Sequence, residues 1–261
     1  MGLVSEFKRS VNIMDRLRGD GGCPWDKEQT VNTLKKYIIE EAHELVEALE
    51  SRKRKDIVEE LGDLFFQVLF QARIGREKGA FSLKDVFRGL NEKMTRRHPH
   101  VFGSLKGKVN SSKEVLSNWA GSKKKEGKKS VLQGVPKRMP SLLRAYRVTE
   151  KAAGVGFDWR NSKEIVDKLL EEIEEFKKEN IKKRKNRGAL ENEIGDMLFT
   201  AVNLSRFLNI DPDYSLRKTI DKFHRRFHYI EKKLKKEGVD IRSAGIDKMD
   251  KLWNEGKKKG I

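Results

Sequence analysis

Apolar residues recur every three to four positions along most of this chain, and no stretch alternates in the manner of a β-strand. Glycine, proline and polar segments interrupt the pattern and mark where helices end. In the first half, Ser82 can cap one helix, and Pro99 disfavours helical geometry at His98, so that this helix ends after Arg97. The pattern predicts helices over residues 5–18, from a cap at Thr30 or Asn32 to about Leu49, over 57–77, over 83–97, and around Trp119.

The second half shows the same order of helices, turns and polar connectors. Residues 154–159 form a glycine-rich turn, 182–188 form a basic connector, and Pro212 with Asp213 forms a further turn. Helices are predicted over 141–153, from Ser162 to the basic connector, over 190–208, over 215–236 and over 249–259. Helices are the only regular elements predicted, so the expected fold class is all-α, with two small helical bundles in tandem.

Four landmarks occur twice in the same order, at an offset close to half the chain. The pairs are 39–45 (IEEAHEL) with 170–176 (LEEIEEF), 60–66 (ELGDLFF) with 193–198 (EIGDML), 93–97 (KMTRR) with 222–226 (KFHRR), and Trp119 and Lys123 with Trp253 and Lys257. A repeat of this length indicates a duplicated domain rather than a short-period solenoid. We expect an N-terminal domain over 1–123, a linker over 124–140, and a C-terminal domain over 141–261.

Composition places the protein among soluble helical proteins. Its 261 residues suit two domains of roughly 130 residues each, and its charged content of 38% predicts highly solvated surfaces. The single cysteine, Cys23, has no disulfide partner within the chain, which favours a cytoplasmic location. No apolar stretch approaches the roughly 20 residues that span a bilayer, so no membrane segment is expected.

The formal net charge of +18 leaves three kinds of partner open. A basic chain can bind nucleic acid, a membrane surface or a small anionic substrate. The excess lies in lysine-rich runs at 123–125, 182–185, 232–236 and 257–259, and such runs are most often solvated faces or helix ends. Charge alone therefore does not identify the partner.

Paired acidic motifs carry the chemistry of the second repeat. On a helix, Glu171, Glu172 and Glu175 share one arc, because each residue turns by roughly 100°. Glu193 and Asp196 are three residues apart and also share one face. If the two helices pack antiparallel, the acids converge and repel one another unless a cation neutralises them. The donors are all hard oxygens, which favours Mg²⁺ or Mn²⁺ over Zn²⁺.

A single EExxE motif is usually solvated decoration on a helix, but the recurrence of the whole arrangement favours a site. The first repeat keeps all of these acids and the other paired landmarks, so it is a candidate second site. Its residues are Glu40, Glu41, Glu44, Glu60, Asp63, Lys93, Arg97, Trp119 and Lys123.

Cations and an indole narrow the ligand class. Lys222 and Arg226 are four residues apart and lie on one helical face, and Lys257 follows Trp253 at the same spacing. A polyphosphate suits a site in which a metal held by carboxylates faces lysine and arginine side chains. An indole can stack on a nucleobase. The alternative for Trp253 is a core or capping residue, and for Lys222 and Arg226 a solvated helix face.

These motifs carry a resemblance to a known family. The acidic pattern, together with 93–102 (KMTRRHPHVF), 154–159 (GVGFDW) and 222–227 (KFHRRF), resembles the MazG family of all-α nucleoside triphosphate pyrophosphohydrolases in its tandem two-domain form. The resemblance covers nearly the whole chain. It implies Mg²⁺-dependent hydrolysis of NTPs or dNTPs between the α- and β-phosphates, giving NMP and pyrophosphate, and it implies a homodimer.

The resemblance also implies roles for individual residues. Glu172, Glu175, Glu193 and Asp196 match the metal ligands of the family, and Glu171 would help to hold a metal or orient the attacking water. Lys222 and Arg226 match its phosphate contacts. Trp253 and Lys257 match nucleotide contacts, as do Lys168 and Asn192.

We favour the C-terminal repeat as the catalytic one. Pro99 truncates the first-repeat helix just past Arg97, whereas Arg226 lies inside an uninterrupted helix. Two alternatives stay open: a relative with a narrower substrate such as dUTP, dCTP or phosphoribosyl-ATP, and a basic nucleic-acid-binding regulatory protein. The chain has no RNA-binding aromatic motif, zinc-ligand spacing or clear helix-turn-helix, so we expect no nucleic-acid partner.

Overall fold

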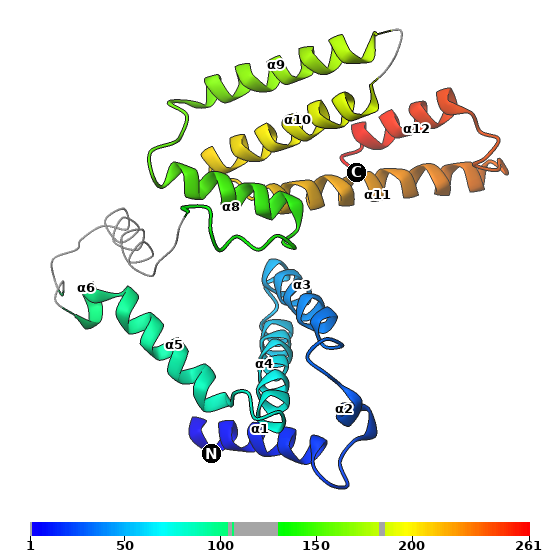
Figure 1. The fold of residues 1–261 in the computed structure, drawn as a ribbon. Helices are drawn as coiled ribbons and strands as arrows, with labels where there is room; N and C mark the ends of the chain where they lie inside the picture. The colour runs from blue at the N-terminus through cyan, green and yellow to red at the C-terminus, as the bar shows by residue number, and fades with distance from the viewer. Residues whose placement is uncertain (1, 104–105, 107–129, 183–185) are drawn as a thin grey trace. The chain divides into compact units, whose positions relative to one another are not determined.

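The computed structural model describes residues 2–103, 106, 130–182 and 186–261, and within them every regular element is an α-helix, which confirms the predicted fold class. The chain divides into two compact units, Met1–Asn110 and Ser111–Ile261 (Figure 1). The helix predicted around Trp119 and the proposed boundaries at 123/124 lie outside the described residues, so the domain limits stay predictions. No helix in the described ranges has the length and apolar character that crossing a membrane requires.

The first unit is built on a helical hairpin. Its elements are α1 (Leu3–Arg18), α2 (Pro24–Glu28), α3 (Lys35–Ser51), α4 (Arg54–Glu77), α5 (Leu83–Arg97) and α6 (Pro99–Phe102). The tight connection between α3 and α4 makes these helices antiparallel neighbours (Figure 1). The core beneath them contains Met14, Leu34, Leu69, Phe70 and Ile74.

The first unit differs from the predicted helices in three places. A one-turn helix that was not predicted, α2, begins at Pro24, because proline at a first helical position needs no hydrogen-bond acceptor for a backbone N–H. Helix α3 begins at Lys35, after turns in which Thr30 and Thr33 bond to each other, rather than at Thr30 or Asn32. Helix α4 begins at Arg54, three residues before the predicted start at 57.

The predicted end of α5 is confirmed. His98 leaves the helical region, with φ −119° and ψ 57°, and Pro99 starts the separate turn α6. At the other end of α5, Ser82 and Asp85 form a reciprocal capping box. Arg97 therefore lies on the last turn of its helix.

The second unit contains a corresponding helical hairpin, formed by its second and third helices. Its elements are α8 (Ser141–Ala153), α9 (Ser162–Asn180), α10 (Arg187–Phe207), α11 (Pro212–Lys236) and α12 (Ile246–Lys258). Asn161 and Asn186 cap α9 and α10 through their side chains. Helix α11 begins at Pro212, where a turn was predicted, because Asp211 accepts hydrogen bonds from the first free N–H groups. Helix α12 begins three residues before the predicted start at 249.

Packing in the second unit brings α9 alongside α10 and α12 alongside α11, while α8 contacts both α10 and α11 (Figure 1). Ile165 on α9 is fully buried, and Ile230, Leu234 and Leu252 form the core between α11 and α12. The α9–α10 pairing sets the acidic motif of one helix against that of the other. This pairing builds the site.

Candidate metal and nucleotide site

Three acids of the second unit meet across the α9–α10 hairpin. Carboxylate oxygens of Glu172 and Glu175 on α9 and of Glu193 on α10 lie within 4.8 Å of one another. Glu172 is only 5% exposed, and the other two side chains are half-buried. We call Glu172, Glu175 and Glu193 the second-unit trio. The convergence expected from helical spacing is therefore present for these three residues.

The remaining acids of the motif lie at the edge of this trio. Asp196 is exposed and is not one of the three convergent ligands, but its charge acts on Glu193. Glu171 is exposed and pairs with Lys168. Glu179, which the sequence analysis missed, also acts on Glu193; its spacing of four residues from Glu175 was the available signal.

Burial and the negative charges of neighbouring acids determine the electrostatics of Glu193. Burial raises the pKa of Glu193 above its ordinary value of 4.5, and the charges of Glu175, Glu172 and Asp196 raise it further. A bound cation relieves both effects, because it replaces lost hydration and neutralises the repulsion. The all-carboxylate donor set fits a hard divalent metal rather than a soft one.

Lys168 already supplies a positive charge at this place. Its Nζ lies 2.8 Å from Glu171 Oε1 and 2.9 Å from Glu172 Oε1. Hydrogen bonds to these two carboxylates raise the pKa of Lys168, so the side chain is a firmly protonated ammonium. This lysine was predicted to contact the nucleotide, and in the structure it contacts two of the acids.

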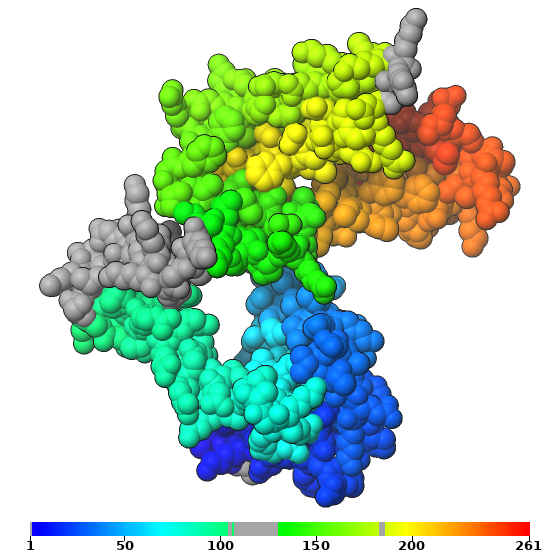
Figure 2. Space-filling model, in the orientation of Figure 1, coloured from blue at the N-terminus to red at the C-terminus, as the bar shows by residue number. Residues whose placement is uncertain are grey.

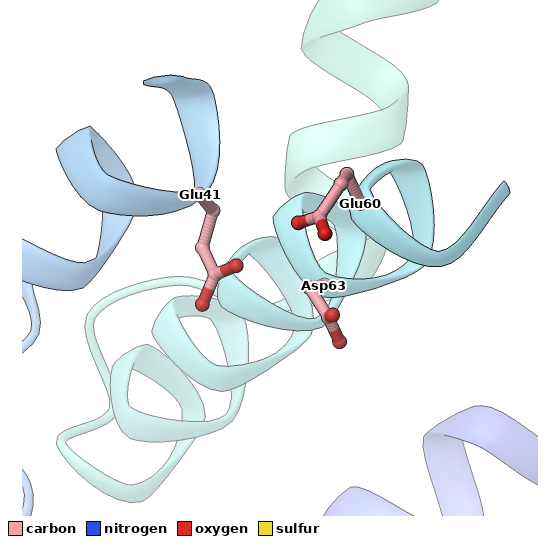
Figure 3. A group of neighbouring side chains, drawn as sticks. All are labelled: Glu41, Glu60 and Asp63. Atoms are coloured by element: carbon pink, nitrogen blue, oxygen red, sulfur yellow. The ribbon is translucent and has the colours of Figure 1, made fainter. Parts of the chain in front are cut away.

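The first unit carries a parallel acid cluster. Glu41 extends from α3 toward α4, which carries Glu60 and Asp63 (Figure 3), and oxygens of these three residues lie within 4.8 Å of one another. We call them the first-unit trio. Burial is the main cause that raises the pKa of both Glu41 and Glu60. Glu40 and Glu44 add repulsion but do not join the three convergent ligands.

Gln67 supports the first-unit trio and was missed in the sequence analysis. It is 7% exposed and its Nε2 donates to Glu41 Oε1 over 3.4 Å. Its signal was the spacing of four residues from Asp63 on the same helix. Among the described side chains, Glu60 also presents a buried Oε2 that has no hydrogen-bond partner. An unsatisfied buried carboxylate oxygen beside two other acids is a fitting ligand for a cation.

The predicted phosphate-binding and base-binding residues lie on α11 and α12. The Arg226 guanidinium lies 5.4 Å from the Trp253 ring centroid, and Arg226 Nε donates to the backbone oxygen of Ile261 over 2.7 Å. Trp253 also contacts the Phe223 ring at 5.2 Å and packs against the α11–α12 core, so it has the packing role considered as its alternative. Lys222 and Lys257 are exposed.

A polar network that the sequence analysis missed fixes α12 on α11. The Tyr229 hydroxyl donates to Glu255 Oε1 over 2.5 Å, and Lys259 Nζ donates to the same oxygen over 2.6 Å. The hydrogen bonds from Lys259 and Tyr229 lower the pKa of Glu255 to about 2. The spacing of four residues between Glu255 and Lys259 was its only sequence signal. The network holds the helix that carries Trp253 and Lys257.

Other predicted residues contribute less to the described geometry. Asn192 is exposed on α10, Lys93 is exposed on α5, and Arg97 is half-buried at the end of α5. Trp119 and Lys123 of the candidate second site lie outside the described residues.

Comparison with known proteins identifies the family. The sequence model of the MazG nucleotide pyrophosphohydrolase domain matches residues 29–102 and 160–230, which hold the two acid clusters. The chain belongs to the MazG family. Both expectations drawn from the motifs, the family and its tandem arrangement, are thereby confirmed. Trp253 and Lys257 lie beyond the second matched segment.

Whole-chain relatives support the same assignment. The chain is 42% identical to the nucleoside triphosphate pyrophosphohydrolase/pyrophosphatase MazG of Thermotoga maritima, over 96% of this chain and 95% of that protein. It is 37% identical to the nucleoside triphosphate pyrophosphohydrolase of Escherichia coli, over 99% of both chains. It is also 46% identical to the uncharacterized protein YabN of Bacillus subtilis, over 98% of this chain and 52% of that protein.

The strain in the second-unit trio predicts a stabilising substitution. The folded state raises the pKa of Glu193, so its contribution to stability falls as the pH rises from 4.5 through the raised value, and it stays low at neutral pH. Glu193→Gln removes the charge. We therefore expect a higher Tm than wild type in EDTA at pH 7.5, and a smaller rise in Tm on adding Mg²⁺, both measured by differential scanning calorimetry.

The control is Glu191→Gln on the same helix, where the exposed Glu191 pairs with Arg187. It should change neither quantity much, because an exposed pair contributes little. A lower Tm for Glu193→Gln in EDTA would contradict the electrostatic account.

Proposed function

We propose that this chain is a Mg²⁺-dependent pyrophosphohydrolase that cleaves nucleoside triphosphates between the α- and β-phosphates, releasing NMP and pyrophosphate. The observation that carries the proposal is the convergence of Glu172, Glu175 and Glu193 within 4.8 Å, inside a segment matched to the MazG nucleotide pyrophosphohydrolase domain. The names of the Thermotoga maritima and Escherichia coli relatives support the same reaction class.

The second-unit trio would hold the metal, with Asp196 as a further ligand and Glu171 orienting the attacking water. A bound Mg²⁺, or Mn²⁺ in its place, would withdraw charge from the phosphates and lower the pKa of a coordinated water. Glu172 is nearly buried, and a buried carboxylate can hold a ligand in one fixed position because packing restricts its rotamers.

Cationic side chains would bind the polyphosphate. Lys222, Arg226 and Lys257 are assigned to the phosphates, where they offset the charge that develops on the departing pyrophosphate. Trp253 and Asn192 are assigned to the nucleoside. The contact between Arg226 and the Trp253 ring supports this grouping, because it places the residue assigned to phosphate beside the residue assigned to the base.

The second unit is the catalytic one in this proposal. Helix α11 runs on to Lys236, ten residues past Arg226, whereas α5 ends at Arg97 itself. A guanidinium within a continuous helix is held more rigidly than one on a last turn, where helices fray. Corresponding positions also differ: Tyr37 replaces Lys168 and Glu59 replaces Asn192 in the first repeat. These replacements remove a cation and add an acid where a polyphosphate would bind.

We also propose a cytoplasmic homodimer. The α9–α10 hairpin leaves large apolar side chains exposed, among them Leu170 at 55% and Leu198 at 57%, on helices that also carry the acids. A second copy of the chain would bury this face, as apolar surface of this kind marks interaction sites. A single unpaired cysteine suits a reducing compartment.

Product analysis tests the reaction. With Mg²⁺ and a panel of NTPs, dNTPs and phosphoribosyl-ATP, we expect monophosphate and pyrophosphate in equal amounts, measured by anion-exchange chromatography. EDTA should abolish release. Turnover of only dUTP, dCTP or phosphoribosyl-ATP would favour the narrower alternative, and release of orthophosphate would refute cleavage at the α–β bond. A salt-sensitive affinity for DNA or RNA without turnover would support the nucleic-acid-binding alternative.

Matched substitutions test the choice of unit. We expect Glu172→Gln to lower kcat at least a hundredfold, because it removes a metal ligand, and Glu41→Gln to retain most of the wild-type kcat. Initial rates of pyrophosphate release measure both. Circular dichroism of each variant controls for folding, and equal losses from the two substitutions would contradict the assignment.

The dimer proposal is tested by charge. Leu198→Glu places a carboxylate on the exposed face of α10 and should convert the dimer into a monomer of 30.2 kDa, measured by light scattering coupled to gel filtration. Ile246→Glu is the control, because Ile246 is also an exposed apolar residue but lies at the start of α12. A monomeric wild-type protein would refute the proposal.

A further inference from the structure

Lys168 contacts one of the carboxylates that the predicted metal needs. Its ammonium lies 2.9 Å from Glu172 Oε1, and Glu172 is one of the three convergent acids. Among the described residues, Lys168 is the cation that the structure sets against the second-unit trio. The ammonium and a divalent metal therefore compete for the same carboxylate, that of Glu172.

Burial explains why this carboxylate needs a partner. The Glu172 side chain is 7% exposed, so its ionised form has lost most of its hydration. An ammonium at hydrogen-bonding distance compensates for this loss, one helical turn away on α9. The Lys168 side chain itself is 35% exposed, so its end has room to leave on a flexible four-carbon stem.

We propose that Lys168 is an exchangeable counter-ion: it neutralises Glu172 in the metal-free enzyme and moves to a substrate phosphate when a divalent cation enters the trio. A divalent metal bound by Glu172 repels the ammonium, and the phosphates that arrive with the metal attract it. This inference rests on the proposed function and adds a coupling to it. Metal alone binds weakly because it must displace the lysine, and nucleotide strengthens metal binding because it accepts the lysine.

The first repeat provides a natural contrast. Tyr37 stands three residues before Glu40, as Lys168 stands three residues before Glu171. Glu41, the counterpart of Glu172, receives a hydrogen bond from the neutral amide of Gln67 instead of an ammonium. The two trios share their acids and differ in the charge of the group beside them. Coupling between metal and nucleotide is therefore a property of the second unit.

The test separates metal binding from nucleotide binding in the full chain. All variants carry Glu41→Gln, which removes a ligand of the first-unit trio so that titration reports the second unit. Mn²⁺ is titrated by isothermal calorimetry without nucleotide. We expect Lys168→Met to bind Mn²⁺ about five- to tenfold more tightly than its parent, because the competing charge is gone. Lys168→Arg, which keeps the charge, should bind Mn²⁺ as the parent does.

Lys177→Met is the matched control. Lys177 lies on the same helix and pairs with Glu174 at 2.7 Å, but both side chains are 60% exposed and Glu174 is not part of the trio. This variant should leave Mn²⁺ affinity unchanged, which shows that loss of a lysine from α9 is not itself the cause.

The second arm measures nucleotide at saturating Mg²⁺, with α,β-methylene-ATP as the probe because it resists cleavage at the α–β bond. Lys168→Met should bind it about tenfold more weakly than the parent. The two effects have opposite signs, which a merely structural role of Lys168 would not produce, since misplaced acids weaken both ligands. Unchanged or weaker Mn²⁺ binding, or unchanged nucleotide binding, would overturn the proposal. The Mn²⁺ arm is independent of turnover, so its outcome is distinct from failure of the proposed reaction.

Discussion

Repulsion between carboxylates across a helical hairpin is the constraint on which the site depends. In each unit two antiparallel helices bring carboxylate oxygens of three acids within 4.8 Å of one another, where their negative charges repel. Burial is the main cause of the raised pKa values of Glu193, Glu41 and Glu60, and the charges of neighbouring carboxylates raise these values further. Clustered carboxylates of this kind attract positive charge. The packing of the helices determines where that positive charge can bind.

The apolar packing of each unit sets the geometry of the acids. Helix α9 turns Ile165 inward, where it is fully buried, and the same helix therefore carries Glu172 and Glu175 toward α10. Helices α11 and α12 form their own core and are joined by the Tyr229–Glu255–Lys259 network. The residues assigned to phosphate and base thus stand on a rigid helix pair of their own. Precise placement of this kind is what binding a charged polyphosphate requires.

Duplication has kept the acids and changed their surroundings. In the second unit the trio contains Glu175, and in the first it contains Asp63, although both repeats have both acids in sequence. Lys168 supplies a charged partner in one unit and Gln67 a neutral one in the other. The two trios therefore differ in one of their three acids and in the charge of the group beside them.

The amino-acid sequence by itself determined the helical class, the duplication, the break at His98 and the faces on which the acids lie. These follow from helical periodicity and from proline geometry, which are local properties of the chain. The starts of α2 and α11 were harder to predict, because proline is favoured both at a first helical position and in turns. The start of α3 was harder to predict because Thr30 and Thr33 bond to each other in the turns before it.

Only the tertiary structure decided which acids meet and what stands beside them. Spacing places Glu175, Glu193 and Asp196 on suitable faces, but the distance between two helices and the rotamer of each side chain select the three that converge. The contact of Lys168 with Glu172, the support of Glu41 by Gln67 and the packing of Trp253 likewise depend on neighbours that rotamers and packing select. The residue pattern determines the helix face on which a side chain lies, and packing between helices determines which residue that side chain contacts.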